Sequence, residues 1–174
     1  MIEGFIDRWP EIVVAVLALA GLAFIGGSTT DIGPWYKGLK FPRLKPPDWA
    51  FGPGWTLIYV FIGTSAVIAW GAADVEDRTM MALLFAINWV LNAFWSPLFF
   101  RLRRPDLALY EWVAFWLSIV ALVVFLFRIS TLAGWLMVPY LAWVTYAGWL
   151  NWRVVVLNRP FTGSPSGVAQ ATRE

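Results

Sequence analysis

Long apolar runs, separated by short charged or Gly- and Pro-rich stretches, fill most of the chain. A helix needs about 20 apolar residues to cross the roughly 30 Å hydrocarbon core of a bilayer. Five runs come close to this length, and none has the strict alternation of apolar and polar residues that barrel strands require. They cover residues 12–27, 49–73, 79–100, 107–127 and 132–157. This pattern predicts an all-α membrane protein, a bundle of five transmembrane helices.

One membrane domain, residues 1–157, is expected to hold all five spans. Residues 158–174 are rich in Thr, Gly, Ser and Pro, a composition that buries little apolar area, so they are expected to form a flexible tail. The first run follows a short charged segment, as it would in a signal peptide. Because acidic residues interrupt that segment, we expect the run to remain as a helix.

Basic residues are divided unequally between the two ends of such a bundle. With five spans the termini lie on opposite faces, so three Lys or Arg fall on the N-terminal face and ten on the other, which accounts for all 13. Loops rich in Lys and Arg remain in the cytoplasm. We therefore expect the N-terminus outside, and the first loop and the C-terminus in the cytoplasm, in a bacterial cell membrane.

Composition narrows the possible chemistry. Hydrophobic residues make up 60% of the chain and charged residues 14%, while Cys and His are absent. Their absence excludes thiol nucleophiles, disulfides, imidazole general bases and the usual axial ligands of haem iron, and we expect no metal site. A net charge of +2, with the basic residues spread over the loops, does not favour nucleic-acid binding. Aromatic residues reach 18%, more than interfacial anchoring requires, which suggests a role in binding.

The first inter-helix loop, residues 30–48, is the longest polar segment and holds several aromatic residues and prolines. Trp35, Tyr36, Pro46 and Pro47 are typical of an ordered segment, and we interpret them as a lid over a cavity. The alternative is an interfacial aromatic belt followed by a Pro-rich turn. Asp48, at the end of the loop, is expected to cap the following helix.

Two helix faces carry the polar and aromatic side chains best suited to a ligand. Asn88, Asn92 and Trp95 are separated by four and three residues, so they share one face of the third span. Amides in a membrane need partners, and these two serve either as contacts between helices or as part of a pocket. The fifth span has a comparable stripe, in which a small Ala leaves room for a flat ligand or a neighbouring helix. It consists of Pro139, Trp143, Ala147, Leu150 and Asn151.

Glu111 is the one acidic residue embedded in a predicted span. It lies five residues after Asp106, close to the expected cytoplasmic end, so its side chain can reach the interface. We interpret it as structural.

Taken together, these motifs resemble the TspO/MBR family of translocator proteins, formerly called peripheral-type benzodiazepine receptors, over most of the chain. The matching residues are Trp35, Tyr36, Leu39, Lys40, Pro46, Pro47, Trp49, Phe51, Pro53, Trp55, Tyr59, Asn92, Trp95, Pro97, Phe99, Phe100, the run from Pro139 to Trp143, Leu150 and Asn151. Two positions depart from the family pattern. The family usually has Lys-Pro where this chain has Lys40-Phe41-Pro42, and Gln where it has Asn88.

The resemblance implies a protein, commonly a homodimer, whose cavity beneath the first loop binds tetrapyrroles such as protoporphyrin and haem. Sterols and isoquinoline- or benzodiazepine-type compounds are further ligands of the family. No cofactor is obligatory, and porphyrin or haem would be a ligand. Carried over by motif, the ligand-binding residues are Phe51, Trp55, Asn88, Asn92, Trp95, Trp143, Ala147 and Leu150.

Three functions and a structural role follow as alternatives. The first is a binding protein that senses, sequesters or transfers a tetrapyrrole or another lipophilic ligand and regulates tetrapyrrole metabolism or a stress response. The second is an enzyme for light- and oxygen-dependent porphyrin breakdown, with Trp55 and Trp143 as the redox-active side chains and no conventional catalytic residue. The third is a passive translocator of porphyrin or sterol. A purely structural membrane subunit would leave the aromatic loop without a ligand.

Overall fold

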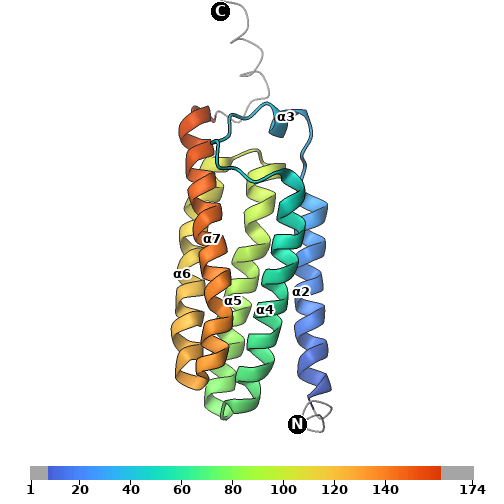
Figure 1. Ribbon diagram of the computed structural model, residues 1–174, viewed down its shortest axis with the longest axis vertical. Helices are drawn as coiled ribbons and strands as arrows, with labels where there is room; N and C mark the ends of the chain where they lie inside the picture. The colour runs from blue at the N-terminus through green and yellow to red at the C-terminus, as the bar shows by residue number, and fades with distance from the viewer. Residues whose placement is uncertain (1–7, 162–174) are drawn as a thin grey trace, which may run out of the picture.

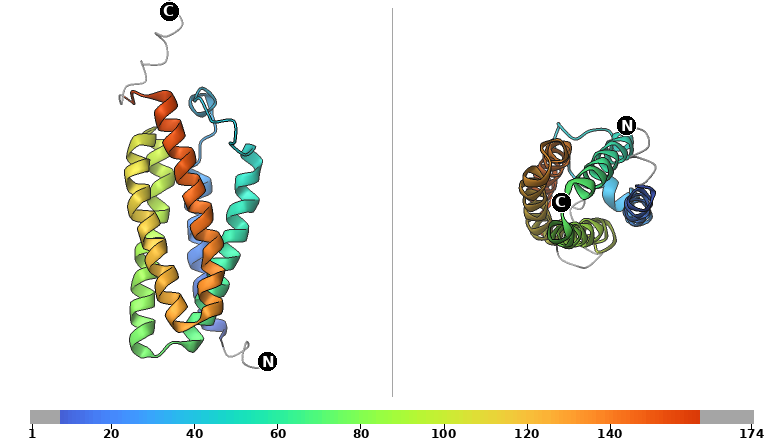
Figure 2. Two further views of the ribbon diagram at one scale, coloured as in Figure 1. Left: turned by 60° about the vertical axis from the view of Figure 1, so that its left-hand side comes forward. Right: turned by 90° about the horizontal axis from the view of Figure 1, so that it is seen from below.

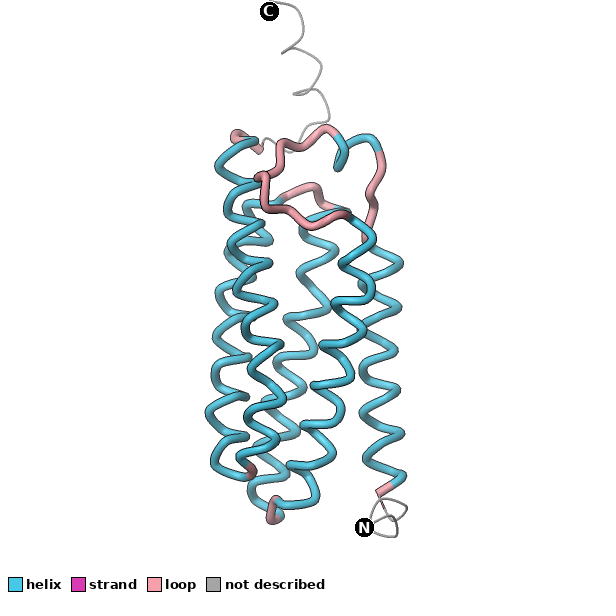
Figure 3. Tube along the Cα trace, viewed as in Figure 1, coloured by secondary structure: helices cyan, strands magenta, loops and turns pink. Residues whose placement is uncertain are grey.

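The computed structural model describes residues 8–161, and five long helices dominate them (Figure 1). The long helices are α2 (Trp9–Thr29), α4 (Phe51–Ala72), α5 (Val75–Ser96), α6 (Pro105–Ile129) and α7 (Thr131–Asn158). Three short elements join them at one end of the bundle: the helix α3 (Pro34–Lys37), the 3-10 turn η1 (Asp48–Ala50) and the π-helical turn η2 (Pro97–Arg101). The described residues contain no strand, and loops are confined to the ends of the helices (Figure 3). The predicted helical class is confirmed.

Four of the five long helices have the length and composition to cross a membrane. They are the segments Trp9–Thr29, Asp48–Ala72, Val75–Arg101 and Pro105–Ile129. The fifth helix, α7, has 28 residues and runs beside the others, but it is rich in Trp and Tyr and includes Asn151 and Arg153, which lower its hydropathy. The chain is therefore a multi-pass membrane protein, and the crossing of α7 stays a prediction.

Helix α5 begins four residues before the predicted span, because charged residues form its first turn. The side chain of Asp74 caps the helix by accepting a hydrogen bond from the backbone N–H of Asp77 at 2.8 Å. Glu76 and Asp77 also lie close to the positive end of the helix dipole, which favours acidic side chains. The hydropathy pattern had placed these residues in a loop.

The end of α7 includes Asn158, which the sequence analysis had placed in the tail. Its side chain holds the first loop: Oδ1 accepts from the N–H of Lys40 at 2.8 Å, and Nδ2 donates to the carbonyl of Lys40 at 2.9 Å. The predicted tail from residue 162 onward lies outside the described residues.

The core lies between α4, α5, α6 and α7, where Ile119, Leu122, Leu126 and Met137 are fully buried. Helix α2 contributes little to this core, since Leu22 is its one buried residue. Seen from below, α2 stands outside the other helices, beside α4 and α5 (Figure 2). Cavities are therefore most easily formed between α2 and the rest of the bundle.

A polar network in the core depends on Tyr140, whose side chain is fully buried. Its hydroxyl donates to Oδ1 of Asn88 and accepts from Nδ2 of Asn92, each at 3.1 Å. We expect Tyr140→Phe to lower the free energy of unfolding by about 1 kcal/mol, because two amide groups lose a partner. Thermal unfolding in detergent measures this change. Tyr110→Phe, at an exposed position, is the matched control and should unfold like the wild type.

Candidate ligand cavity

A cavity of about 750 Å³ lies beneath the first loop, at the end of the bundle where α3 and η2 meet. Small residues of α2 form one wall: Gly26 and Gly27 have open space where a Cβ would stand. The opposite walls come from α4, the end of α5, η2 and α7. The volume falls within the range of 300–1,000 Å³ that is typical of small-molecule sites.

Six of the eight residues predicted to bind a ligand line this cavity. They are Phe51, Trp55, Asn92, Trp95, Ala147 and Leu150. The π-helical turn η2 adds Phe99 and Phe100, which continue the aromatic face of α5. The rings of Trp95 and Phe99 are stacked, with centroids 5.1 Å apart and planes 24° apart.

Trp143 lies behind the lining and supports it. Its ring meets Phe51 and Trp55 edge to face, with centroids 6.1 and 6.2 Å apart. Gly54 makes room for this indole, because a Cβ there would come within 2.6 Å of the Trp143 ring. The indole Nε1 is buried and has no hydrogen-bond partner among residues 8–161. The structure therefore gives Trp143 a packing position behind the cavity wall.

Asn88 does not reach the cavity beneath the loop. Its Nδ2 donates to Oγ of Ser118 at 2.8 Å, and its Oδ1 accepts from Tyr140, so the amide connects α5 with α6 and α7. One turn further along, Asn92 both contacts Tyr140 and lines the cavity. Both amides therefore make contacts between helices and also line a cavity: Asn92 lines the cavity beneath the first loop, and Asn88 lines a second one.

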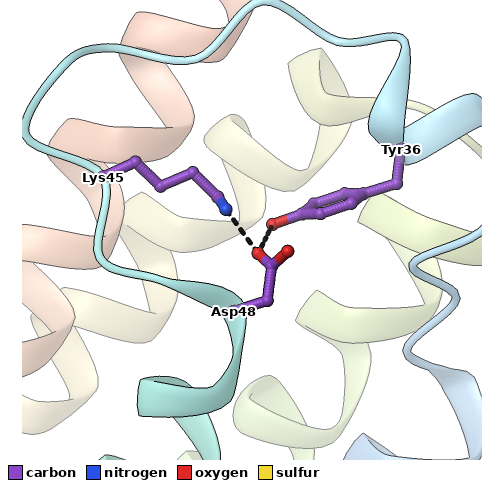
Figure 4. Close-up of polar contacts among 3 residues, drawn as sticks. All are labelled: Tyr36, Lys45 and Asp48. Atoms are coloured by element: carbon purple, nitrogen blue, oxygen red, sulfur yellow. Dashed lines mark hydrogen bonds and ion pairs between the residues drawn. The ribbon is translucent and has the colours of Figure 1, made fainter.

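An acidic side chain at the end of the first loop connects two other residues of that loop (Figure 4). Asp48 accepts a hydrogen bond from the hydroxyl of Tyr36 at 3.0 Å and forms an ion pair with Lys45. The Lys45 ammonium also lies 4.7 Å from the ring centroid of Phe41. Burial and the bond to Asp48 raise the pKa of Tyr36, so its hydroxyl stays protonated. The expected role of Asp48 as a helix cap is wrong, because its side chain makes no capping bond.

The four predicted loop residues occupy different positions. Tyr36 lines the cavity, as do two further residues of the loop, Phe41 and Lys45. Trp35 packs edge to face on Phe99, at 6.1 Å, outside the lining. Pro46 and Pro47 are likewise outside the lining and precede the turn η1. A signal for Lys45 was present in the sequence, since it is a cation three residues from Asp48 within an aromatic loop.

Glu111 does not reach an interface through its carboxylate, contrary to the expectation. Both of its carboxylate oxygens are buried and lack a hydrogen-bond partner within residues 8–161. Helix α6 turns this residue onto the same side as Phe115, which is buried in the core.

Comparison with known proteins assigns the chain to a family. The sequence model of the TspO/MBR family matches residues 13–157 of this chain. The chain is 35% identical to the tryptophan-rich protein TspO of Archaeoglobus fulgidus over 150 residues, which cover 85% of this chain and 97% of that protein. It is 32% identical to the tryptophan-rich sensory protein of Cereibacter sphaeroides, over 82% of this chain and 88% of that protein. The human translocator protein is 32% identical, over 74% and 78% respectively. The chain therefore belongs to the TspO/MBR family.

Proposed function

We propose that this membrane protein binds a tetrapyrrole in the cavity beneath its first loop and acts in sensing, sequestration or transfer of that ligand. The observation that carries the proposal is a cavity of about 750 Å³ whose mainly apolar lining includes nine aromatic side chains and a few polar groups. A porphyrin is a flat aromatic plate, and stacking on indole and phenyl rings suits it. Relatives named as a sensory protein and a translocator protein support a role of this kind.

The polar groups of the cavity fit the edges of a porphyrin. Asn92 can offer an amide to the macrocycle, and the first loop places the ammonium group of Lys45 in the lining, where a propionate would meet it. His and Cys are absent from the chain, so stacking and hydrogen bonds, rather than iron ligation, would hold a haem. Sterols and isoquinoline- or benzodiazepine-type compounds are competing occupants, which displacement of bound porphyrin would reveal.

Lys45→Met tests the contact with the propionates. We expect the affinity for protoporphyrin to fall about tenfold, because a charge-assisted hydrogen bond is lost while the apolar stem is kept. The affinity for the dimethyl ester of protoporphyrin, which has no carboxylate, should change little. Fluorescence titration of the purified protein with both compounds measures the two affinities.

Lys37→Met is the matched control, since Lys37 belongs to the same loop but is exposed and lies outside the cavity lining. It should bind both compounds as the wild type does. An equal loss of diacid and ester in Lys45→Met would mean that Lys45 orders the loop without contacting a carboxylate.

The distribution of charge supports an orientation for the protein. The described basic residues of the first loop, of the turn after α5 and of the end of α7 all lie at the end of the bundle that holds the cavity. We propose that this end faces the cytoplasm, that the N-terminus lies outside, and that the membrane is a bacterial cell membrane. Association into a homodimer belongs to the same proposal.

Light-dependent porphyrin breakdown is the second candidate function, and the contact between Trp55 and Trp143 favours it. Trp55 lines the cavity and its ring meets that of Trp143, so an oxidising equivalent formed beside the ligand could pass between two indoles. We expect illumination in air to bleach bound porphyrin in the wild type and much more slowly in Trp55→Phe. Absorbance spectra recorded in light and in the dark measure the rate. Bleaching at equal rates in both proteins would reject a role for Trp55.

A further inference from the structure

A second cavity, of about 520 Å³, lies between α2, α4 and α5, nearer to the start of α2. Its lining is almost entirely apolar, with Leu19, Ile62 and Phe85 among its walls. It shares Leu22 and Asn92 with the cavity beneath the first loop, and the rest of its lining is different. The two cavities therefore follow one another along α2.

Two contacts along the second cavity hold α2 in place. Nε1 of Trp89 donates to the carbonyl of Ala18 at 2.8 Å. At the start of α2, Nη1 of Arg8 lies 3.5 Å from the carbonyl of Val67, and its guanidinium covers Gly71, where a Cβ would overlap it. Several of the lining residues are small, which leaves space between α2 and the helices beside it. These small residues are Ala15, Ala18, Gly63, Ala66 and Ala82.

Asn88 and Asn92 also belong to the lining, but Ser118 and Tyr140 already bond to their amides, so Glu11 gives this apolar cavity its unpartnered polar group. Glu11, in the first turn of α2, belongs to the lining, and its Oε2 atom is buried without a hydrogen-bond partner among the described residues. A buried carboxylate oxygen without a donor is costly, so a ligand that brings a donor to this position is favoured. The cavity thus fits a molecule with a donor at one end and an apolar body.

The length of the cavity restricts the shape of that molecule. Glu11 and Leu22 are separated by 11 residues on one helix, which corresponds to roughly 16 Å at a rise of 1.5 Å per residue. We propose that the second cavity binds a single-chain amphiphile, whose hydroxyl head donates to Glu11 and whose hydrocarbon chain lies between α2, α4 and α5. Such a molecule can be a bilayer monoacylglycerol or a free fatty alcohol.

Photolabelling of the full chain in phosphatidylcholine nanodiscs tests this site. The probe is a long-chain fatty alcohol with a diazirine in its chain, and the comparison compound is its methyl ether, which has no donor. We expect saturable labelling of the lining segments of α2 and α5, with about tenfold weaker labelling by the ether. Unlabelled monoacylglycerol or fatty alcohol should compete, and the stronger competitor identifies the source of the ligand. Competition by neither would overturn the proposal.

Two variants locate the binding. Glu11→Leu should weaken labelling by the alcohol about tenfold and leave labelling by the ether unchanged, whereas Glu76→Leu, which replaces an exposed acid at the same end, should have no effect. Ala66→Phe should block both probes by filling the cavity. Labelling that does not saturate, or that is equal for alcohol and ether in the wild type, would show that bilayer lipid fills a crevice without recognition.

The proposal stands apart from tetrapyrrole binding. Protoporphyrin titration of Glu11→Leu should match that of the wild type, because Glu11 lies outside the cavity beneath the loop. The titration with protoporphyrin and the photolabelling therefore test the two cavities independently, and either proposal can fail without the other. The comparison of the two probes on the wild type needs no variant, so it holds even where Ala66→Phe does not fold.

Discussion

Gly148→Ala is expected to lower the free energy of unfolding by about 3 kcal/mol. Gly148 is buried where α7 packs on α6, and a Cβ there would overlap the indole of Trp112. That indole is fixed by a hydrogen bond from its Nε1 to the carbonyl of Val144 at 2.8 Å. Overpacking costs about 1–3 kcal/mol and a lost hydrogen bond about 1 kcal/mol. Thermal unfolding of the detergent-purified protein, followed by circular dichroism, measures the loss.

Gly27→Ala is the control for the same substitution in a helix. Gly27 has no heavy atom within 4 Å of a Cβ position, so only helix propensity changes, and stability should stay equal or rise by up to about 1 kcal/mol. Similar unfolding temperatures for the two variants would mean that α6 and α7 do not pack as closely as described.

Ala147→Phe is expected to lower the affinity for protoporphyrin at least a hundredfold, which corresponds to about 2.8 kcal/mol. Ala147 lines the cavity on α7, beside Leu150, and a phenyl ring there would occupy the space that a flat ligand needs. Quenching of Trp fluorescence in the dark, at increasing protoporphyrin concentration, gives the affinity of the wild type and that of the variant. The substitution is expected to destabilise the complex with porphyrin and not the free protein, because the empty cavity has room for the new ring.

Ala142→Phe adds the same ring to the exposed side of α7 and controls for general effects of the substitution. It should bind protoporphyrin like the wild type. Full binding by Ala147→Phe, with unfolding temperatures matching in all three proteins, would place the ligand somewhere other than this cavity.

The sequence predicts the helices well, because their apolar runs are long and their boundaries carry charge, Gly or Pro. The bounds differ by up to four residues, and the early start of α5 has a clear cause. Hydropathy excludes charged residues from a span, but Asp74 caps α5 and the acidic residues that follow favour its first turn. Local capping chemistry thus extends a helix beyond its apolar part.

The candidate site is predictable only in part, since a helix face does not reveal which cavity it meets. Asn88 and Asn92 share a face of α5 and both bond to Tyr140 of α7, yet of the two amides only Asn92 lines the cavity beneath the first loop. Trp143 was expected to contact a ligand, but Phe51 and Trp55 stand in front of it. Such outcomes depend on the tilt and rotation of neighbouring helices, which one sequence does not specify.

The contacts within the first loop were also not predictable from the sequence. Its aromatic residues and prolines indicate order, but the pairing of Asp48 with Tyr36 and Lys45 depends on a turn that brings both ends of the loop together. Ala23 and Gly27, two small residues of α2, line the cavity and leave room for it, although nothing in the sequence shows which face of α2 meets the loop.

Equilibrium titration of the full chain with protoporphyrin, in lipid nanodiscs and in the dark, shows directly whether the protein binds a tetrapyrrole. Porphyrin absorbance and Trp fluorescence are followed together, with empty nanodiscs as the reference for partition into lipid. We expect saturable binding of one porphyrin per chain, with quenching of the cavity Trp residues. An uptake that rises without saturation and equals that of empty nanodiscs would contradict it.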